Sequence, residues 1–230
     1  MVRKHIGTQD DDSFVGNRRD ELFRGKAGED AIFGGRGDDT LHGGGDDDYL
    51  SGDQDDDFIF GGAGADALYG GGGRDVLYGG RANDRLFNYR GGRDEFYGGL
   101  GNDEIITARA TKHAWGGEGA DTFVALLDEE GEFFTRLVIE DFDVRADRLD
   151  VMEWASLGFP FPDDADRVKV RRVDFDGDGK RDDIRVKLFV DDNGNGRKAD
   201  GAFLLRDVKL SDFKDHADDI FYGGLYGFDL

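Results

Sequence analysis

The chain has 230 residues, of which 52 are acidic and 30 are basic, so its formal net charge is −22. This balance disfavours nucleic acid and anionic membranes as partners and favours cations. The chain contains no cysteine, which excludes a disulfide framework and a zinc–thiolate site. No apolar run reaches the length needed to cross a bilayer. The length fits one large domain or two small ones.

Residues 1–6 form a short lead to a repetitive stretch that we place at 7–124. The opening segment MVRKHIGTQDDDSF has basic residues but no apolar stretch. It therefore lacks the features of a secretory signal peptide.

Within 7–124 a nine-residue pattern recurs, G-G-x-G-x-D-x-U-x with U a large apolar residue. We number the nine positions of each repeat as slots one to nine. Only repeat 88–97 carries an extra residue, and every eighth slot is apolar. Twelve of the thirteen sixth slots are acidic, and the residues in that slot are Asp12, Glu21, Asp30, Asp39, Asp48, Asp57, Asp66, Asp75, Asp84, Asp94, Asp103, Lys112 and Asp121.

This composition of slots indicates both a ligand and a fold. Carboxylate oxygen is the donor that calcium prefers, and glycine in slots one, two and four permits φ > 0 and a close approach of carbonyl groups to an ion. The last three residues of each repeat are expected to form a strand with the eighth side chain inward. Besides the acidic residues from Asp30 to Asp121, the candidate calcium-binding positions are Gly28, Gly35, Gly37, Gly62, Gly64, Gly71, Gly73, Gly99, Gly101, Gly117 and Gly119.

The repeat resembles the hemolysin-type calcium-binding nonapeptide of the RTX family. The resemblance implies an all-β protein, a right-handed parallel β-roll with two nonapeptides per coil, so that repeats n and n+2 lie above one another. Calcium would then bridge stacked repeats, for example Asp39 to Asp57 and Asp48 to Asp66. It also implies a secreted protein that folds on binding several Ca²⁺ ions outside the cell.

The same resemblance implies export by a type I secretion apparatus, whose clients carry a C-terminal signal. The last residues, DDIFYGGLYGFDL, are acidic, then aromatic, with a hydrophobic end, as in such signals. The apparatus and calcium ions are therefore the expected partners.

The repeats are not uniform. Asp46, Asp55, Ala82 and Ala110 occupy slot four, where a side chain must fit a position that favours glycine. Repeat 107–115, TARATKHAW, has lost its glycines and its Asp, so we expect a coil without calcium on that side. Pairs of stacked acidic slots allow roughly six to ten ions.

Residues 125–230 are expected to form a C-terminal cap with a β-meander. The segment 135–154 resembles the sequence that follows the last RTX repeat, and a solenoid needs its terminal core covered. Apolar residues that alternate with charged ones predict strands over 167–175, 183–190 and 202–210. Residues 211–221 predict a short helix with Ser211 as N-cap.

Two acidic turns in this region resemble the first half of an EF-hand loop. Asp174, Asp176 and Asp178 give D-x-D-x-D-G, and residues 191–196 give D-x-N-x-N-G. Both lack the glutamate at the twelfth position. Each is either a calcium site or an ordinary hairpin turn rich in Asp, Asn and Gly.

Slots seven and nine are expected to face outward, and many of them are aromatic. One face would carry Phe58, Phe60, Val76, Tyr78, Tyr97 and Trp115, and the other Tyr49, Tyr69, Phe87 and Ile106, with Arg85 among them. Three readings are open: cross-strand pairing, a face covered by the C-terminal half or a second chain, or an adhesive module that binds polysaccharide or a surface partner. In the last reading the partner-binding residues would be Tyr69, Phe87, Tyr78 and Trp115.

Catalytic motifs are missing from the sequence. It contains no H-E-x-x-H, no G-x-S-x-G and no P-loop, so we do not expect an enzyme. His42 and His113 fall in outward slots, where we expect solvated side chains.

Overall fold

The structure is a computed structural model of the full chain. It describes residues 2–90, 92–108, 110–127, 135–153, 167–173, 183–189, 201–206, 208, 210–216 and 228–229. The two EF-hand-like turns, including Asp174, Asp176 and Asp178, lie outside the described residues.

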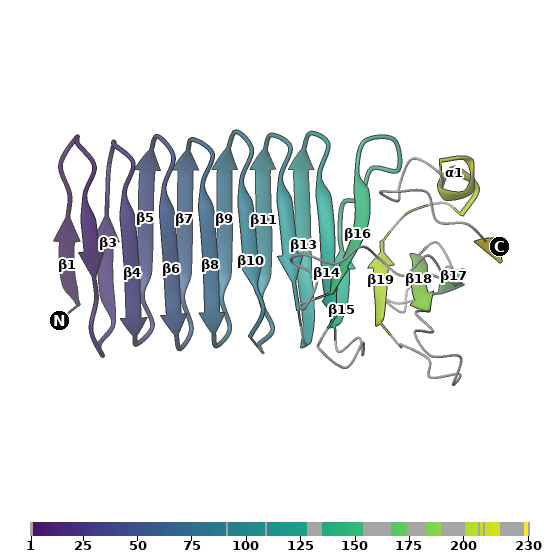
Figure 1. Ribbon diagram of the computed structural model, residues 1–230, viewed down its shortest axis with the longest axis horizontal. Coiled ribbons are helices and arrows are strands. Elements are labelled where there is room, and N and C mark those ends of the chain that lie inside the picture. Colours follow the sequence, from purple (N-terminus) through teal and green to yellow (C-terminus); the bar gives the residue numbers. More distant parts are fainter. Residues whose placement is uncertain are drawn as a thin grey trace.

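Successive short strands alternate between two facing sheets along the length of the molecule (Figure 1). One sheet, the odd sheet, contains β1 (Arg3–Ile6), β3 (Glu21–Arg24), β5 (Thr40–Gly45), β7 (Phe58–Ala63), β9 (Val76–Arg81), β11 (Glu95–Leu100), β13 (Ala110–Glu118) and β15 (Thr135–Ile139). The other, the even sheet, contains β2 (Ser13–Val15), β4 (Ala31–Arg36), β6 (Tyr49–Gln54), β8 (Ala67–Gly72), β10 (Arg85–Asn88), β12 (Glu104–Thr107), β14 (Thr122–Leu127) and β16 (Arg148–Glu153).

The strands of the roll pair in parallel with a constant register. Leu41 lies opposite Ile59 in the odd sheet, and Leu50 lies opposite Leu68 in the even sheet. The residues of each pair are two nonapeptides apart in the sequence. Pairs that span the extra residue of repeat 88–97, as between β9 and β11, are one residue further apart and keep the same alignment of slots. The predicted parallel roll, with repeats n and n+2 stacked, is confirmed.

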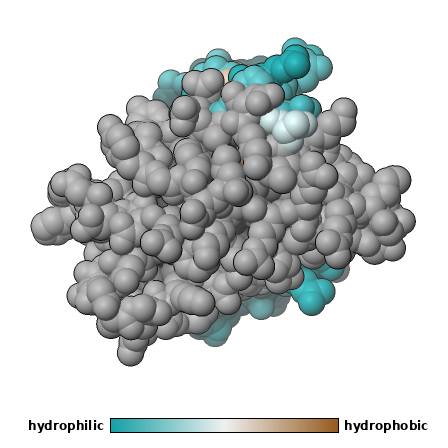
Figure 2. Space-filling model, turned by 90° about the vertical axis from the view of Figure 1, so that its right-hand side faces the viewer, coloured by the Kyte–Doolittle hydropathy of each residue, from teal (hydrophilic) through white to brown (hydrophobic). Residues whose placement is uncertain are grey.

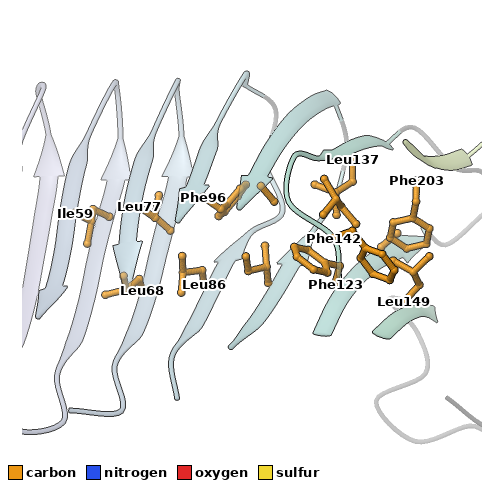
Figure 3. Close-up of a cluster of buried hydrophobic side chains, with 14 of the residues drawn as sticks. Ile59, Leu68, Leu77, Leu86, Phe96, Phe123, Leu137, Phe142, Leu149 and Phe203 are labelled. Carbon is orange, nitrogen blue, oxygen red and sulfur yellow. The ribbon is translucent and has the colours of Figure 1, made fainter. Parts of the chain in front are cut away.

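The core consists of two facing rows of side chains, one from each sheet, that pack against each other between the sheets (Figure 3). The eighth-slot residues from Phe23 to Phe123 are fully buried, which confirms the inward direction of that slot. A single coil has too little apolar surface to form such a core, and stacking makes it continuous.

The hydrophobic core continues beyond the last repeat. Leu137, Phe142 and Leu149 are buried and belong to the same cluster, as do Phe203 and Phe213. The segment around 135–149 therefore extends and covers the core, as expected for a solenoid end. The stacking itself continues past residue 124, because β15 pairs with β13 and β16 pairs with β14. The division of the chain into domains after 124 stays a prediction.

The C-terminal strands continue the odd sheet. β17 (Arg167–Val173), β18 (Asp183–Phe189) and β19 (Gly201–Leu205) form the predicted antiparallel meander, and β19 pairs in parallel with β15. A short strand, β20 (Phe228–Asp229), pairs with β17. Seen from this end of the molecule, the visible described residues are mainly hydrophilic (Figure 2).

Two details of this region differ from the prediction. The third strand ends at Leu205, and helix α1 (Leu210–Asp215) begins before Ser211. Ser211 is thus inside the helix and is not its N-cap. Among the described residues, no helix has the length and apolarity of a membrane span.

Candidate calcium sites

The sixth-slot carboxylates stack along the two edges of the roll. The odd ladder, which precedes the odd strands, consists of Glu21, Asp39, Asp57, Asp75 and Asp94; the even ladder consists of Asp12, Asp30, Asp48, Asp66, Asp84, Asp103, Asp121 and Asp147.

One oxygen of each aspartate fixes its place in the ladder. Asp57 Oδ1 accepts a hydrogen bond from the backbone N–H of Asp39 (2.8 Å), and Asp66 Oδ1 accepts one from Asp48 (2.8 Å). The structure therefore brings together both pairs that the sequence analysis selected. Because the backbone holds each carboxylate in the same way, the second oxygen points to an equivalent place in every coil.

That second oxygen has no donor at seven positions of the described chain. It is Oδ2 of Asp30, Asp39, Asp48, Asp57, Asp66, Asp84 and Asp103. These residues are between 1% and 3% exposed. A buried carboxylate oxygen without a partner is costly, so each position calls for a proton or a cation.

The slot-one glycines make room for these oxygens. A methyl carbon on Gly34 would lie 2.6 Å from Asp39 Oδ2 and 2.8 Å from the carbonyl oxygen of Gly52 in the next coil. A carboxylate and a carbonyl oxygen thus face one small space that any side chain would fill. Both are hard oxygen donors, the set that suits calcium.

The prediction that slot one needs φ > 0 is wrong. Positive φ occurs in slots two and four, at all eleven predicted glycines Gly28, Gly35, Gly37, Gly62, Gly64, Gly71, Gly73, Gly99, Gly101, Gly117 and Gly119. Slot one takes glycine because of space rather than backbone twist. Asp46, Asp55 and Ala82 adopt φ between 71° and 75° in slot four, as the sequence predicted for side chains in that slot. Ala110, also predicted in slot four, lies instead at the start of strand β13.

Side chains alone do not build a metal site in the described part of the chain. No group of three or more carboxylate, imidazole or thiolate side chains converges there. An ion would therefore be held by the free aspartate oxygens together with backbone carbonyls.

Burial raises the pKa of the ladder carboxylates. It raises the pKa of Asp57 to about 9 and that of Asp84 to about 8, and the neighbouring ladder carboxylates act in the same direction. The pKa of Asp48 is raised to about 7 and those of Asp39 and Asp66 to about 6, again by burial first. The cause is the loss of hydration of the charged form. Without a cation, Asp57 and Asp84 hold protons at neutral pH, whereas Asp39 and Asp66 are mostly ionised there and carry buried charge.

The odd ladder differs at its C-terminal end. Asn88 Nδ2 donates to Asp75 Oδ2 (3.0 Å) and to Asp94 Oδ2 (2.9 Å), and Lys112 Nζ lies 2.6 Å from Asp94 Oδ2. Lys112 occupies the slot where other repeats carry Asp. The oxygens of Asp75 and Asp94, predicted as calcium ligands, are therefore hydrogen-bonded within the chain.

Two further groups of residues, which the search for calcium ligands did not include, form hydrogen bonds between neighbouring coils at the edges of the roll. Asp147 extends the even ladder by accepting the N–H of Asp121 (2.9 Å). Its signal was its place two residues before the buried Leu149, as in a repeat. Carboxylates in slot five also form hydrogen bonds to the next coil. For example, Asp56 Oδ1 accepts the N–H of Arg74 (2.8 Å).

The aromatic side chains of the odd sheet form a flat stack. The rings of His42, Phe60, Tyr78, Tyr97 and Trp115 follow one another at centroid distances of 4.5–5.0 Å and interplanar angles of 10° or less. Such a stack stabilises neighbouring strands. It also covers both ring faces of Tyr78 and one ring face of Trp115, two of the predicted partner-binding residues.

The two outward histidines are partly exposed to solvent, with 38% of the His113 side chain accessible, but each also contacts a neighbouring side chain. His42 stacks on Phe60 at 4.7 Å, and burial lowers its pKa. His113 Nδ1 lies 2.6 Å from Glu140 Oε1. Both contacts join neighbouring coils, and the nonapeptide pattern does not specify them.

The aromatic side chains of the even sheet line a groove instead. Its volume is about 560 Å³, and its lining includes Phe33, Tyr49, Tyr69, Phe87, Tyr89, Arg18, Arg36 and Arg90. Adjacent rings from Phe33 to Tyr89 are 5.0–5.5 Å apart but tilted by 34–70°. Their faces are therefore not stacked against one another.

Comparison with known proteins identifies the repeat. Residues 6–41, 15–50, 24–59, 51–86 and 90–108 match the family model of the RTX calcium-binding nonapeptide repeat. One similar solved structure is the AlgE6R3 subunit of the Azotobacter vinelandii mannuronan C5-epimerase, with 25% identity, a TM-score of 0.38 and coverage of 75% of this chain and 80% of that chain. No curated protein matches the chain.

Two nearby glycines of β5 allow a test of whether slot one requires glycine because a side chain there would collide with the ladder carboxylate. A methyl group on Gly43 would collide with the carboxyl group of Asp48, whereas one on Gly45 meets only the carbonyl oxygen of Lys26, at 3.7 Å. Gly43→Ala should destabilise the folded protein by about 1–3 kcal/mol through overpacking. Gly45→Ala should change stability by less than about 0.5 kcal/mol. Thermal unfolding in calcium measures both, and equal effects would contradict the assignment.

The raised pKa values predict that acid stabilises the metal-free roll. The folded-state pKa values of about 6 to 9 lie above the ordinary value for aspartate. Their contribution to stability is complete below about pH 4 and is lost as the pH rises through the folded values. Metal-free protein should therefore unfold at a higher temperature at pH 5 than at pH 8, by about 5 °C or more, with a Tm at pH 8 that is already near or below room temperature.

Saturating calcium provides the control for this pH dependence. Calcium binds the ionised carboxylate, so the Tm in calcium should not fall between pH 5 and pH 8. A metal-free Tm that rises over this range would refute the protonation argument.

Proposed function

We propose that this chain, in which RTX calcium-binding nonapeptide repeats recur over residues 6–108, is a secreted calcium-binding protein whose roll folds when calcium binds. The seven buried aspartate oxygens without donors carry the proposal. Each faces a neighbouring coil at a position where a cation would neutralise stacked carboxylates.

The charge of the chain supplies the switch. The formal net charge is −22, and the ladders place carboxylates in successive coils about 4.8 Å apart. At neutral pH and low calcium, the unfolded chain escapes this repulsion and the cost of burying charge. When calcium is abundant, its binding free energy becomes folding free energy.

This behaviour fits a protein that is exported before it folds. In the low calcium of the cytosol the chain would stay unfolded and pass a secretion channel, and outside the cell it would fold. We propose the C-terminal segment 218–230 as the type I export signal, on the basis of its acidic and aromatic composition. The proposal assigns no reaction to the roll.

Calcium titration of metal-free protein at pH 8 tests the proposal. We expect far-UV circular dichroism to change from a largely unfolded spectrum to a β spectrum, and magnesium to fail because it demands a smaller, octahedral site. Asp39→Asn should weaken the calcium response by about tenfold or more, the size expected for about 1.4 kcal/mol. Asp38→Asn removes the same charge from an exposed neighbour and keeps the Oδ1 atom that accepts the N–H of Asp56 (3.1 Å), so it should change the response little.

Two results would refute this function. One is a full β spectrum in metal-free buffer at pH 8. The other is an equal loss of calcium response in Asp38→Asn and Asp39→Asn.

We also propose a second function, the binding of an anionic polysaccharide in the groove of the even sheet. Arg18, Arg36 and Arg90 line it against one acid, Asp53, among the described lining residues. This local excess of positive charge contrasts with the acidic chain. Guanidinium groups recognise carboxylates, and tilted rings leave apolar faces on which sugar rings can pack.

Short oligogalacturonides are a suitable probe for this groove, with neutral malto-oligosaccharides as the ligand control. Calorimetry on the calcium-loaded protein should show binding of the anionic sugar. Tyr69→Ala should weaken it about fivefold, for a ring contact of about 1 kcal/mol. Tyr78→Ala, in the flat stack of the opposite sheet, is the matched control. Equal binding of the neutral sugar, or equal effects of both variants, would contradict the proposal.

A further inference from the structure

The position between Asp75 and Asp94 is unlike the seven free positions of the ladders. Its space is bounded by Asp75 Oδ2 and Asn88 Nδ2, each 2.7 Å from a methyl carbon placed on Gly70. At Gly34 the corresponding pair is Asp39 Oδ2 and a carbonyl oxygen. Here an N–H donor has replaced an oxygen acceptor, so the residues do not fit a metal ion.

The identity of the residue at position 88 explains the change. Asn88 stands in slot one, where most repeats carry glycine. Its amide group fills the space that glycine leaves and contacts the free oxygens of two successive ladder members. Since both neighbours are carboxylate oxygens, the NH₂ end of the amide must face them.

Lys112 completes the replacement. Its ammonium group lies 2.6 Å from Asp94 Oδ2 and donates to the carbonyl oxygens of Asn88 (3.0 Å) and Arg90 (3.3 Å). Three acceptors match the three protons of the ammonium group. The side chains of Lys112 and Asp94 are both fully buried, so the pair is shielded from water and from salt.

We infer that Lys112 and Asn88 are an internal substitute for calcium that holds the successive coils of β11 and β13 together without metal. The odd ladder then offers free oxygens only at Asp39 and Asp57, while the even ladder offers them from Asp30 to Asp103. This inference rests on the proposed calcium binding at those other positions.

The consequence is a difference in local stability along the roll. In a solenoid each coil depends mainly on its own contacts and on its neighbours. The coils of β11 and β13 should remain folded when calcium is removed, and the coils of β5 and β7 should unfold. The metal-free coils would then provide a folded end on which calcium-loaded coils stack.

Hydrogen–deuterium exchange of the metal-free full chain tests this difference. Backbone amides of β11 and β13 should exchange about tenfold or more slowly than those of β5 and β7. Lys112→Met, which keeps the length of the side chain but removes the ammonium group, should abolish the difference. Lys4→Met, an exposed lysine, should preserve it. Equal exchange in β5, β7, β11 and β13 of metal-free protein, with protection restored by calcium, would overturn the inference.

Counting of bound calcium gives a second, independent test. The double variant Asn88→Gly, Lys112→Asp restores the repeat pattern and should bind at least one ion more than the unaltered chain in native mass spectrometry. An unchanged ion count in the folded variant would overturn the inference. Failure of the proposed function looks different, because β5 and β7 would then be protected whether or not calcium is present.

Discussion

Stacked carboxylates whose second oxygen has no donor are the constraint on which the roll depends. The backbone of one coil holds Oδ1 of the next ladder residue, as between Asp39 and Asp57. This places Oδ2 in a buried space beside the equivalent groups above and below. Burial removes the water that would solvate these charges, so the stack needs protons, metal ions or a cationic side chain to be stable.

Glycine serves this arrangement in two distinct ways. In slots two and four it supplies a positive φ, which Asp46 also adopts while its Oδ2 accepts the N–H of Gly28 at 3.0 Å. In slot one it supplies empty space next to the carboxylate. Replacement in slot four therefore strains the backbone, whereas replacement in slot one, as at Asn88, changes the chemistry of the site.

The two edges and the two faces of the roll are not equivalent, although one repeat builds them all. The even ladder keeps its free oxygens along most of the roll, and the odd ladder is closed near Asp94. The odd face uses its aromatic rings for stacking, from His42 to Trp115. The even face leaves tilted rings and arginines around a groove. The proposed specificity for a partner therefore lies on the even face.

The sequence by itself determined the period, the inward eighth slot and most of the positions strained in slot four, and the family resemblance added the pairing of repeats n and n+2. These features repeat, so each residue's neighbours follow from its slot. Only the tertiary structure decided the contacts that break the pattern: Asn88 with Asp75 and Asp94, Lys112 with Asp94, and Asp147 with Asp121. They join residues between 6 and 26 positions apart, including some across an insertion or beyond the last repeat. A slot pattern carries no information about such pairs, because they depend on which side chain reaches the space that another residue leaves.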